Sequence, residues 1–311
     1  MSWMPVALAA YLLLAVANLL DKFLVDNVLK NSRAYAFIAC TLGALVFLAA
    51  PWFLEWPGWP LFLFNILNGA IFAVAIWLLY EALRRGEAAR VLVFIGGATP
   101  VFSLLFSLLF FKERFSGNQW LGMALLLSGI FIIAFLPVAR GFMSRLWRKL
   151  GVAPRVGQGG LGVAAFSALA YSLYFIGTKQ AYFSQPFESA FIWTRLGAVI
   201  FVLFFLLRRD NRQAIYKTFR PSGPNKNKFL VIFNQGIGSV GFILQNYAIF
   251  LGSVVLVNAM QGTQYAFLLI ISAALALLAP RFLKENFSWR IILQKAAAVI
   301  VIFFGLYFMS V

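Results

Sequence analysis

Two segments of this chain carry nearly the same sequence. Residues 36–47 read AFIACTLGALVF and residues 190–201 read AFIWTRLGAVIF, so seven of twelve positions are identical at an offset of 154. A second pair, KERFS at residues 112–116 and KENFS at residues 284–288, has an offset of 172. Offsets that drift slowly are what loop insertions produce after a duplication. The sequence therefore indicates two related halves, which in a strongly apolar chain are typical of transporters.

Apolar stretches long enough to cross a bilayer recur along the whole chain. It is 63% hydrophobic, with a mean hydropathy of +0.89, whereas soluble domains contain roughly 45–50% apolar residues. A membrane-spanning helix needs about 20 apolar residues, and the alternating pattern of barrel strands is absent. The sequence therefore predicts an all-α integral membrane protein with ten transmembrane helices. We expect these helices at residues 4–24, 34–54, 61–82, 89–111, 119–138, 159–179, 188–207, 229–250, 254–279 and 290–310.

Ten spans shared between two halves give five spans per half. Because five is odd, the second half enters the membrane from the opposite side, and the two repeats are inverted. We expect a first five-helix repeat at residues 1–139, a basic linker at residues 140–158 and a second five-helix repeat at residues 159–311. Inverted repeats enclose a cavity near the middle of the membrane, where a substrate binds during alternating access.

Positively charged residues are concentrated on one side of the predicted spans. Connections after the odd-numbered spans carry 21 of the 26 lysines and arginines, whereas the opposite side carries three. Because positive loops stay in the cytoplasm, we expect a multi-pass protein of the cell (inner) membrane with both termini outside the cytoplasm. The net charge of +17 also suits nucleic acid, but short basic loops beside apolar spans predict a bilayer partner and no nucleic acid. The sequence leaves open a monomer or a homodimer.

Several kinds of chemistry are excluded by the residues that the chain lacks. It contains no histidine and a single cysteine, Cys40. The usual general base, the Ser-His and Cys-His dyads and the commonest metal ligand are therefore missing. One cysteine forms no disulfide framework and no thiolate metal site, and no P-loop pattern is present to hydrolyse ATP. We expect no enzyme activity, no cofactor and no bound metal.

A further set of segments resembles a known transporter family. Residues 80–88 (YEALRRGEA), Pro100 and residues 112–116, followed by residues 120–122 (WLG) and Gly129, resemble the EamA-type signature. EamA-type proteins are the ten-helix branch of the drug/metabolite transporter superfamily. The resemblance implies two inverted five-helix repeats, with spans 1–4 and 6–9 lining a central cavity and spans 5 and 10 set apart. It also implies export or exchange of small metabolites, often amino acids. Members of this branch keep both termini in the cytoplasm, whereas loop charge predicts the reverse here.

These observations predict a secondary active transporter. It is expected to move a small polar metabolite, amino-acid-like or another small organic solute, by alternating access at the central cavity. Two alternatives stay open. One is a membrane-embedded enzyme or scaffold that handles lipid, which the missing histidine and the lack of clustered acids disfavour. The other is a multidrug-type exporter of lipophilic cations.

Arg195 is the strongest single candidate for a substrate contact. It lies inside the seventh predicted span, and its repeat equivalent is Thr41, so the shared fold does not require a charge there. Charged groups in hydrocarbon are costly and mark functional sites. The guanidinium is suited to bidentate binding of a carboxylate. Alternatively, Arg195 extends to the lipid headgroups or pairs with Glu188, seven residues earlier on the same helix face.

Amide and aromatic side chains inside other spans complete the expected site. Asn68 matches Asn234 at an offset of 166, so amides recur at equivalent places in both halves. Such groups suit a ligand that needs donors and acceptors together, although membrane helices also use them to bond to each other. The expected substrate-binding residues are Arg195, Asn68, Trp77, Tyr80, Asn234, Gln245, Asn258, Gln261, Tyr265 and Tyr174.

Three further residues have two interpretations each. Pro100 in the fourth span predicts either a helix break beside the binding site or a plain kink. Asp21 and Glu81 are candidates for proton coupling. Both lie at span ends on the basic side, however, so ion pairs with Lys22 and with the arginines at residues 84–85 are the alternative.

Overall fold

The computed structural model describes residues 2–28, 31–85, 88–134, 159–219, 225–278 and 289–310. Throughout these residues the secondary structure is helical, with no strand. The predicted linker at residues 140–158 lies outside the described residues. The all-α prediction is therefore confirmed for the part of the chain that the structure describes.

Helices occupy every apolar stretch expected from the sequence. The first half contains α1 (Trp3–Val28), α2 (Ser32–Gly43), η1 (Ala44–Ala49), α3 (Ala50–Phe53), α4 (Trp59–Arg85), α5 (Ala88–Phe110) and α6 (Gly117–Ala134). The second half contains α8 (Gly159–Tyr182), α9 (Phe187–Leu203), η2 (Phe204–Leu207), α10 (Arg209–Phe219), α11 (Asn225–Leu251), α12 (Val254–Ala259), α13 (Gln261–Leu278) and α14 (Trp289–Ser310). The ninth stretch is divided between α12 and α13, and α10 is an additional helix in a basic connection.

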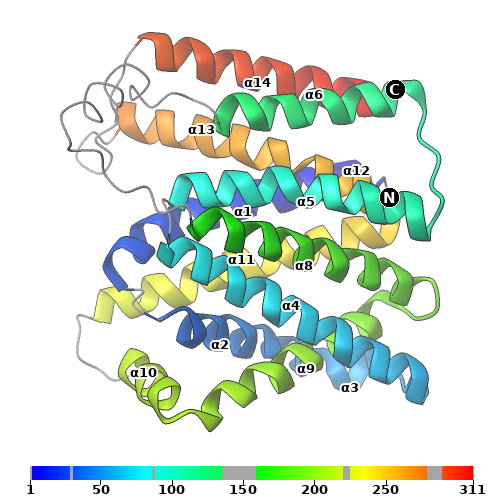
Figure 1. Cartoon of the computed structure of the whole chain (residues 1–311), viewed down its shortest axis with the longest axis vertical. Helices are drawn as coiled ribbons and strands as arrows, with labels where there is room; N and C mark the ends of the chain where they lie inside the picture. Colours follow the sequence, from blue (N-terminus) through cyan, green and yellow to red (C-terminus); the bar gives the residue numbers. More distant parts are fainter. Residues whose placement is uncertain are drawn as a thin grey trace.

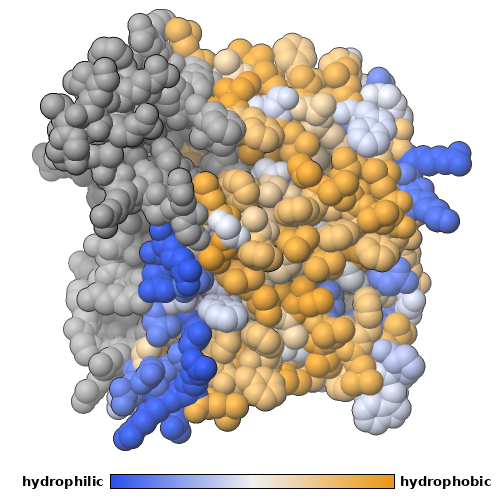
Figure 2. Space-filling model, in the orientation of Figure 1, coloured by the Kyte–Doolittle hydropathy of each residue, from blue (hydrophilic) through white to orange (hydrophobic). Residues whose placement is uncertain are grey.

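Not all of these helices are long and apolar enough to span a membrane by themselves. Within the described residues, four segments meet that standard: Ser32–Phe53, Trp59–Arg85, Gly160–Tyr182 and Phe187–Leu207. Shorter apolar helices are Trp3–Asn18, Phe94–Phe110, Gly117–Ile132 and Ala296–Ser310. The visible face of the molecule is largely hydrophobic, with hydrophilic residues beside α10 (Figure 2). This surface suits a protein surrounded by lipid.

The helices run roughly alongside one another, and both chain ends lie at the same end of the bundle (Figure 1). We call this end the terminus face; it also carries the turns at residues 54–58, 111–116 and 183–186. In the first of these turns Gly58 adopts a φ of +82°, a conformation that favours glycine, directly before α4 begins. α10 lies at the opposite end of the bundle.

Helices of the first half pack along helices of the second half. α4 packs along α8, and α1 packs along α11. In the predicted repeat α1 corresponds to α8 and α4 to α11, and the two contacts would then be equivalent. The last helices of the halves, α6 and α14, pack mainly against each other at one edge of the bundle (Figure 1).

Two glycines bring α4 and α9 into close contact. A Cβ atom at Gly69 would overlap the carbonyl oxygen of Thr194, and one at Gly197 would overlap the backbone of Ile66. Side chains at these positions would therefore push the two helices apart. The contact fixes Arg195, which lies between Thr194 and Gly197 on α9, against the middle of α4.

Candidate functional site

Arg195 is buried among aromatic rings between α4, α8, α9 and α11. Its side chain is 5% exposed. The guanidinium carbon Cζ lies 4.0 Å from the ring centroid of Phe72 on α4, 4.7 Å from that of Phe191 on α9 and 4.6 Å from that of Phe242 on α11. Tyr174 on α8 is the fourth ring, at 5.9 Å. We call Phe72, Tyr174, Phe191 and Phe242 the Arg195 cage.

A short chain of hydrogen bonds leads from Arg195 to α11. Its Nη2 donates to the hydroxyl of Tyr174 at 3.0 Å, and this hydroxyl donates to Oδ1 of Asn246 at 2.8 Å. The Nε of Arg195 is buried and has no hydrogen-bond partner. The guanidinium thus keeps an unused donor on one edge while aromatic rings surround it.

No described carboxylate neutralises Arg195. The ion pairs found among the described residues join Glu81 to Arg84 and to Arg85, and Glu188 is exposed and does not pair with Arg195. Cation–π contacts contribute about 0.5–2 kcal/mol each, whereas burial of an ion costs several kcal/mol. The four rings offset a share of this cost, but they leave the charge itself unneutralised, and a bound anion would neutralise it. The arrangement is chemically suited to hold an anion.

The structure brings two of the ten expected substrate-binding residues, Arg195 and Tyr174, into direct contact. Gln245 is next to Asn246 in sequence but binds elsewhere: its Nε2 donates to the hydroxyl of Tyr11 at 3.3 Å. That hydroxyl in turn donates to the carbonyl of Val257 at 2.7 Å. Gln245 therefore helps to join α11, α1 and α12.

Asn68 connects α4 to α8. In the amide orientation that satisfies both polar atoms, Nδ2 donates to the Tyr174 carbonyl at 3.2 Å and Oδ1 accepts from the Thr178 amide at 3.1 Å. The side-chain amide lies against Gly177, where a Cβ atom would overlap it. Asn68 was expected to contact the substrate, with a hydrogen bond between helices as the alternative. The structure has the hydrogen bond between helices.

Asn258 connects α12 to α5, and Tyr265 connects α13 to α5. Nδ2 of Asn258 donates to Oγ of Ser103 at 3.0 Å, and Ser103 shares a 3.1 Å hydrogen bond with Ser172. The hydroxyl of Tyr265 donates to the carbonyl of Leu92 at 2.5 Å. These polar groups are buried between helices and are not in contact with Arg195.

Trp77 and Tyr80 lie on α4 beyond the cage, towards the end of the bundle that holds α10. The Trp77 ring is 5.6 Å from Phe205 and 5.3 Å from the guanidinium carbon of Arg33. Tyr80 makes an edge contact with Tyr35 at 4.3 Å. Asn234 is buried on α11, and Gln261 is partly buried at the start of α13.

Glu81 is held by ion pairs. Its carboxylate lies 2.6 Å from Nη2 of Arg84 and 2.6 Å from Nε of Arg85, and it accepts a 2.6 Å hydrogen bond from Ser32. The structure therefore contains the ion-pair alternative for Glu81. Asp21 lies on α1, but its side chain is outside the described residues.

The helix that contains Pro100 is not broken there, although a helix break was one of the two expectations for this residue. α5 continues through Pro100 to Phe110, so a complete break does not occur there. The interruption lies instead in the corresponding stretch of the second half, where α12 ends at Ala259 and α13 begins at Gln261. A proline is tolerated inside a membrane helix because neighbouring groups satisfy the freed carbonyl.

Sequence reasoning missed three of the four cage residues as partners of Arg195. Phe191 lies four residues before Arg195 on the same helix, and this one-turn spacing was the available signal. Phe72 and Phe242 come from other helices and are two among 35 phenylalanines. Nothing in the sequence distinguishes them.

Lys179 closes the terminus face between α8 and α11. Its Nζ donates to the carbonyls of Ile249, Phe250 and Gly252 at 3.0, 3.1 and 2.8 Å. These are the free carbonyls at the end of α11, where a positive charge is favourable. Nearby, Oγ of Ser253 donates to Glu113 at 2.7 Å.

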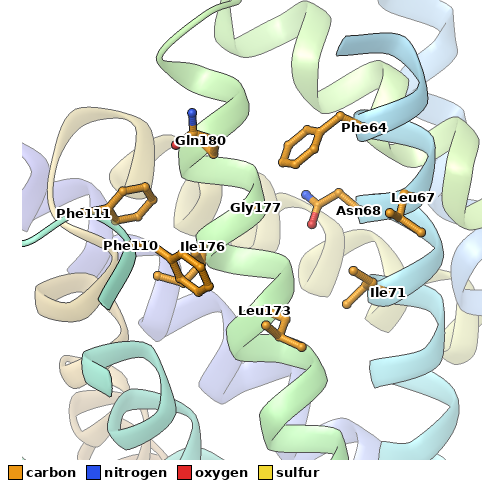
Figure 3. A pocket seen from close by; sticks show the side chains of 10 residues that line it. All are labelled: Phe64, Leu67, Asn68, Ile71, Phe110, Phe111, Leu173, Ile176, Gly177 and Gln180. Atoms are coloured by element: carbon orange, nitrogen blue, oxygen red, sulfur yellow. The ribbon is translucent and has the colours of Figure 1, made fainter. Parts of the chain in front are cut away.

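A separate groove of about 360 Å³ lies between α4, α8 and the end of α5 (Figure 3). Its lining is mostly apolar: Phe64, Leu67, Asn68, Ile71, Phe110, Phe111, Leu173, Ile176, Gly177 and Gln180. Leu67 and Phe110 are 62% and 65% exposed, so the groove opens to the outer surface of the bundle. It is not part of the Arg195 cage.

Comparisons with known proteins agree with this architecture. Residues 1–135 match the model of the EamA-like transporter family, within the drug/metabolite transporter superfamily. The first half is an EamA-like transporter unit. The match covers less than half of the chain, and it makes the first half similar to multi-pass membrane transporters of the drug/metabolite type. A solved crystal structure shares the fold with a TM-score of 0.64 and 18% identity, over 96% of this chain and 95% of the other. No curated protein matches the EamA-like chain.

Proposed function

We propose that this EamA-like chain is a secondary active transporter built from ten transmembrane helices in two inverted repeats. It exports or exchanges a small organic solute across the cell (inner) membrane, with both termini outside the cytoplasm. Two equivalent contacts between the halves, α4 with α8 and α11 with α1, support the inverted arrangement. The pairing of α6 with α14 away from the cage agrees with spans 5 and 10 standing apart.

The observation that carries this proposal is the buried guanidinium of Arg195, which no described carboxylate neutralises. An anionic group of the substrate binds along the free edge of the guanidinium and takes up the unused Nε donor. The bound pair is electrically neutral, and the attraction between its two charges offsets the cost of desolvating them.

Alternating access follows from an asymmetry between two equivalent interfaces. α4 packs closely along α9, whereas α2 and α11, the pair related to them by the repeat, make few contacts among the described residues. On the terminus face, Lys179 joins α8 to the end of α11 within the second half, and the bond from Ser253 to Glu113 joins the two halves. We assign this structure to a state closed at the terminus face. During transport the contact between α4 and α9 loosens and the contact between α2 and α11 becomes close.

Flux into proteoliposomes tests the proposal. Purified protein is reconstituted and offered labelled organic acids, amino acids, nucleosides and lipophilic cations in parallel. We expect movement of at least one anionic solute above empty vesicles, lost in Arg195→Gln and retained in Arg212→Gln, which removes an exposed arginine of α10. If no solute crosses faster than in empty vesicles, the chain is not a transporter of these classes. A fixed central cation disfavours the multidrug alternative, because lipophilic cations are repelled there.

A further inference from the structure

We infer that the substrate is a monocarboxylate anion with an apolar, preferably aromatic, body and no ammonium group. This inference rests on the proposed function, because it names the substrate of the same Arg195 site. It separates the chain from a transporter of amino acids, whose carboxylate and ammonium groups both require a partner.

The charges around the site favour an anion over a zwitterion. Arg195 is a fixed cation at the centre, and the described acidic side chains lie elsewhere. Glu81 is paired with arginines, Glu113 binds Ser253, and the remaining three are exposed: Glu55, Glu188 and Asp210. An ammonium group a few ångströms from the guanidinium would therefore be repelled without a described counter-ion.

The hydrogen-bond acceptors that reach Arg195 are already in use. The Tyr174 hydroxyl accepts from Arg195 and donates to Oδ1 of Asn246. The other end of that amide, Nδ2, donates to the Phe242 carbonyl at 2.8 Å. An ammonium group would have to break this chain to gain an acceptor. A carboxylate instead adds to the unused Nε donor and leaves the chain intact.

The walls of the site are suited to an apolar body. Four rings surround the guanidinium, and Phe242 is the one that is only partly buried. Phe72 and Phe242 also pack against each other, with ring centroids 5.1 Å apart. A substrate ring that enters beside Phe242 can join this stack, and such aromatic pairs add to binding beyond the apolar area that they bury. A second carboxylate on the substrate would face these rings without a partner.

Calorimetric titration of the purified full chain in lipid nanodiscs tests the substrate class. The ligands are 3-phenylpropionate, L-phenylalanine, 3-phenylpropylamine and 3-phenylpropanol, which share a ring and differ in charged groups; acetate tests the contribution of the ring. We expect 3-phenylpropionate to bind about tenfold more tightly than the other four. The amino acid, the amine and the alcohol lack a lone carboxylate for Arg195 or add a polar group without a partner. Acetate lacks the ring. Flux of the same compounds is measured in proteoliposomes.

Three variants identify the site. Arg195→Gln is expected to abolish 3-phenylpropionate binding, Arg195→Lys to weaken it by loss of the planar edge, and Arg212→Gln to leave it unchanged. Phe242→Ala is expected to reduce the preference for 3-phenylpropionate over acetate. Each variant is first checked for a monodisperse size-exclusion peak, and Arg195→Lys, which keeps the charge, remains informative if Arg195→Gln does not fold.

The outcomes separate the substrate class from the transport function. If L-phenylalanine binds as tightly as 3-phenylpropionate, or if none of the five ligands binds, the inferred class is wrong. If other solutes nonetheless cross the membrane in the flux assay, the proposed transporter stands with a different substrate. Binding of 3-phenylpropionate that survives in both Arg195 variants also overturns the inference, because the anion then binds elsewhere.

Discussion

The hydroxyl of Tyr174 lies 3.0 Å from Nη2 of Arg195 and is the hydrogen-bond acceptor that the structure gives this guanidinium. The same hydroxyl is bonded to Asn246 on the neighbouring helix. One oxygen atom therefore links the charged side chain of α9 to α11 through α8. This bond makes Tyr174 part of the packing around Arg195 as well as of the proposed site.

Removal of this hydroxyl is expected to destabilise the ligand-free protein. In Tyr174→Phe, Arg195 loses its acceptor and Oδ1 of Asn246 loses its donor, and unsatisfied buried groups cost about 1–3 kcal/mol each. We expect a lower thermal unfolding temperature in detergent and a larger upward shift when an anionic ligand is added. Tyr307→Phe, at a 56% exposed residue, is the control. Equal unfolding temperatures for wild type and Tyr174→Phe would contradict the assigned bond.

Loss of the Lys179 contact is expected to open the terminus face. Lys179→Gln replaces an ammonium that caps three carbonyls of α11. The chain's single cysteine, Cys40, is 2% exposed on α2 and reports the opening. We expect an impermeant maleimide applied at the terminus face to label Cys40 at least about tenfold faster in the variant, the factor that one charge-assisted hydrogen bond of about 1.5 kcal/mol represents.

A matched control for this experiment lies on the same face. Lys112 is exposed in the turn between α5 and α6, so Lys112→Gln removes an equal charge without uncapping a helix. Labelling of Cys40 at the wild-type rate is expected for Lys112→Gln. If Lys179→Gln also labels at that rate, the contact does not hold the face closed.

A methyl group at Gly69 is expected to disrupt the bundle. In Gly69→Ala the new Cβ overlaps the Thr194 carbonyl of α9, and overpacking of this kind costs about 1–3 kcal/mol or more. Thermal unfolding and the yield of monodisperse protein are the measurements. Gly162→Ala, where nothing lies within 4 Å of the new Cβ, is expected to be neutral or slightly stabilising. Identical behaviour of the two variants would show that α4 and α9 are not in close contact.

Replacement of Glu81 is expected to leave any proton coupling unchanged. Its carboxylate is occupied by Arg84, Arg85 and Ser32, so Glu81→Gln removes a partly exposed ion pair worth at most about 1 kcal/mol. Flux in proteoliposomes should change by less than about fivefold, and its response to an imposed pH gradient should be that of the wild type. A variant that transports but no longer responds to the gradient would restore Glu81 as the coupling residue.

The helices were predictable from the sequence, and most contacts of the site were not. The length of an apolar stretch is a local property, so α4 and α8 could be placed within a few residues. Arg195 stood out because a charge within an apolar span is unusual. Its partners Phe72 and Phe242 depend on how three helices pack, which a single sequence does not encode locally. For Asn68, cavity lining and a bond to another helix use the same residue type, and the structure contains the bond.

The pairing of α6 with α14 has a consequence for biogenesis. Gly122 and Gly129 on α6 leave room for the backbone of Gly305 and the side chain of Ile302 on α14. During synthesis α6 enters the membrane well before α14 does. Until α14 is inserted, the face of α6 that carries Gly122 and Gly129 is in contact with lipid acyl chains. We therefore expect truncation before α14 to leave an intermediate that translocon-associated chaperones or membrane proteases recognise.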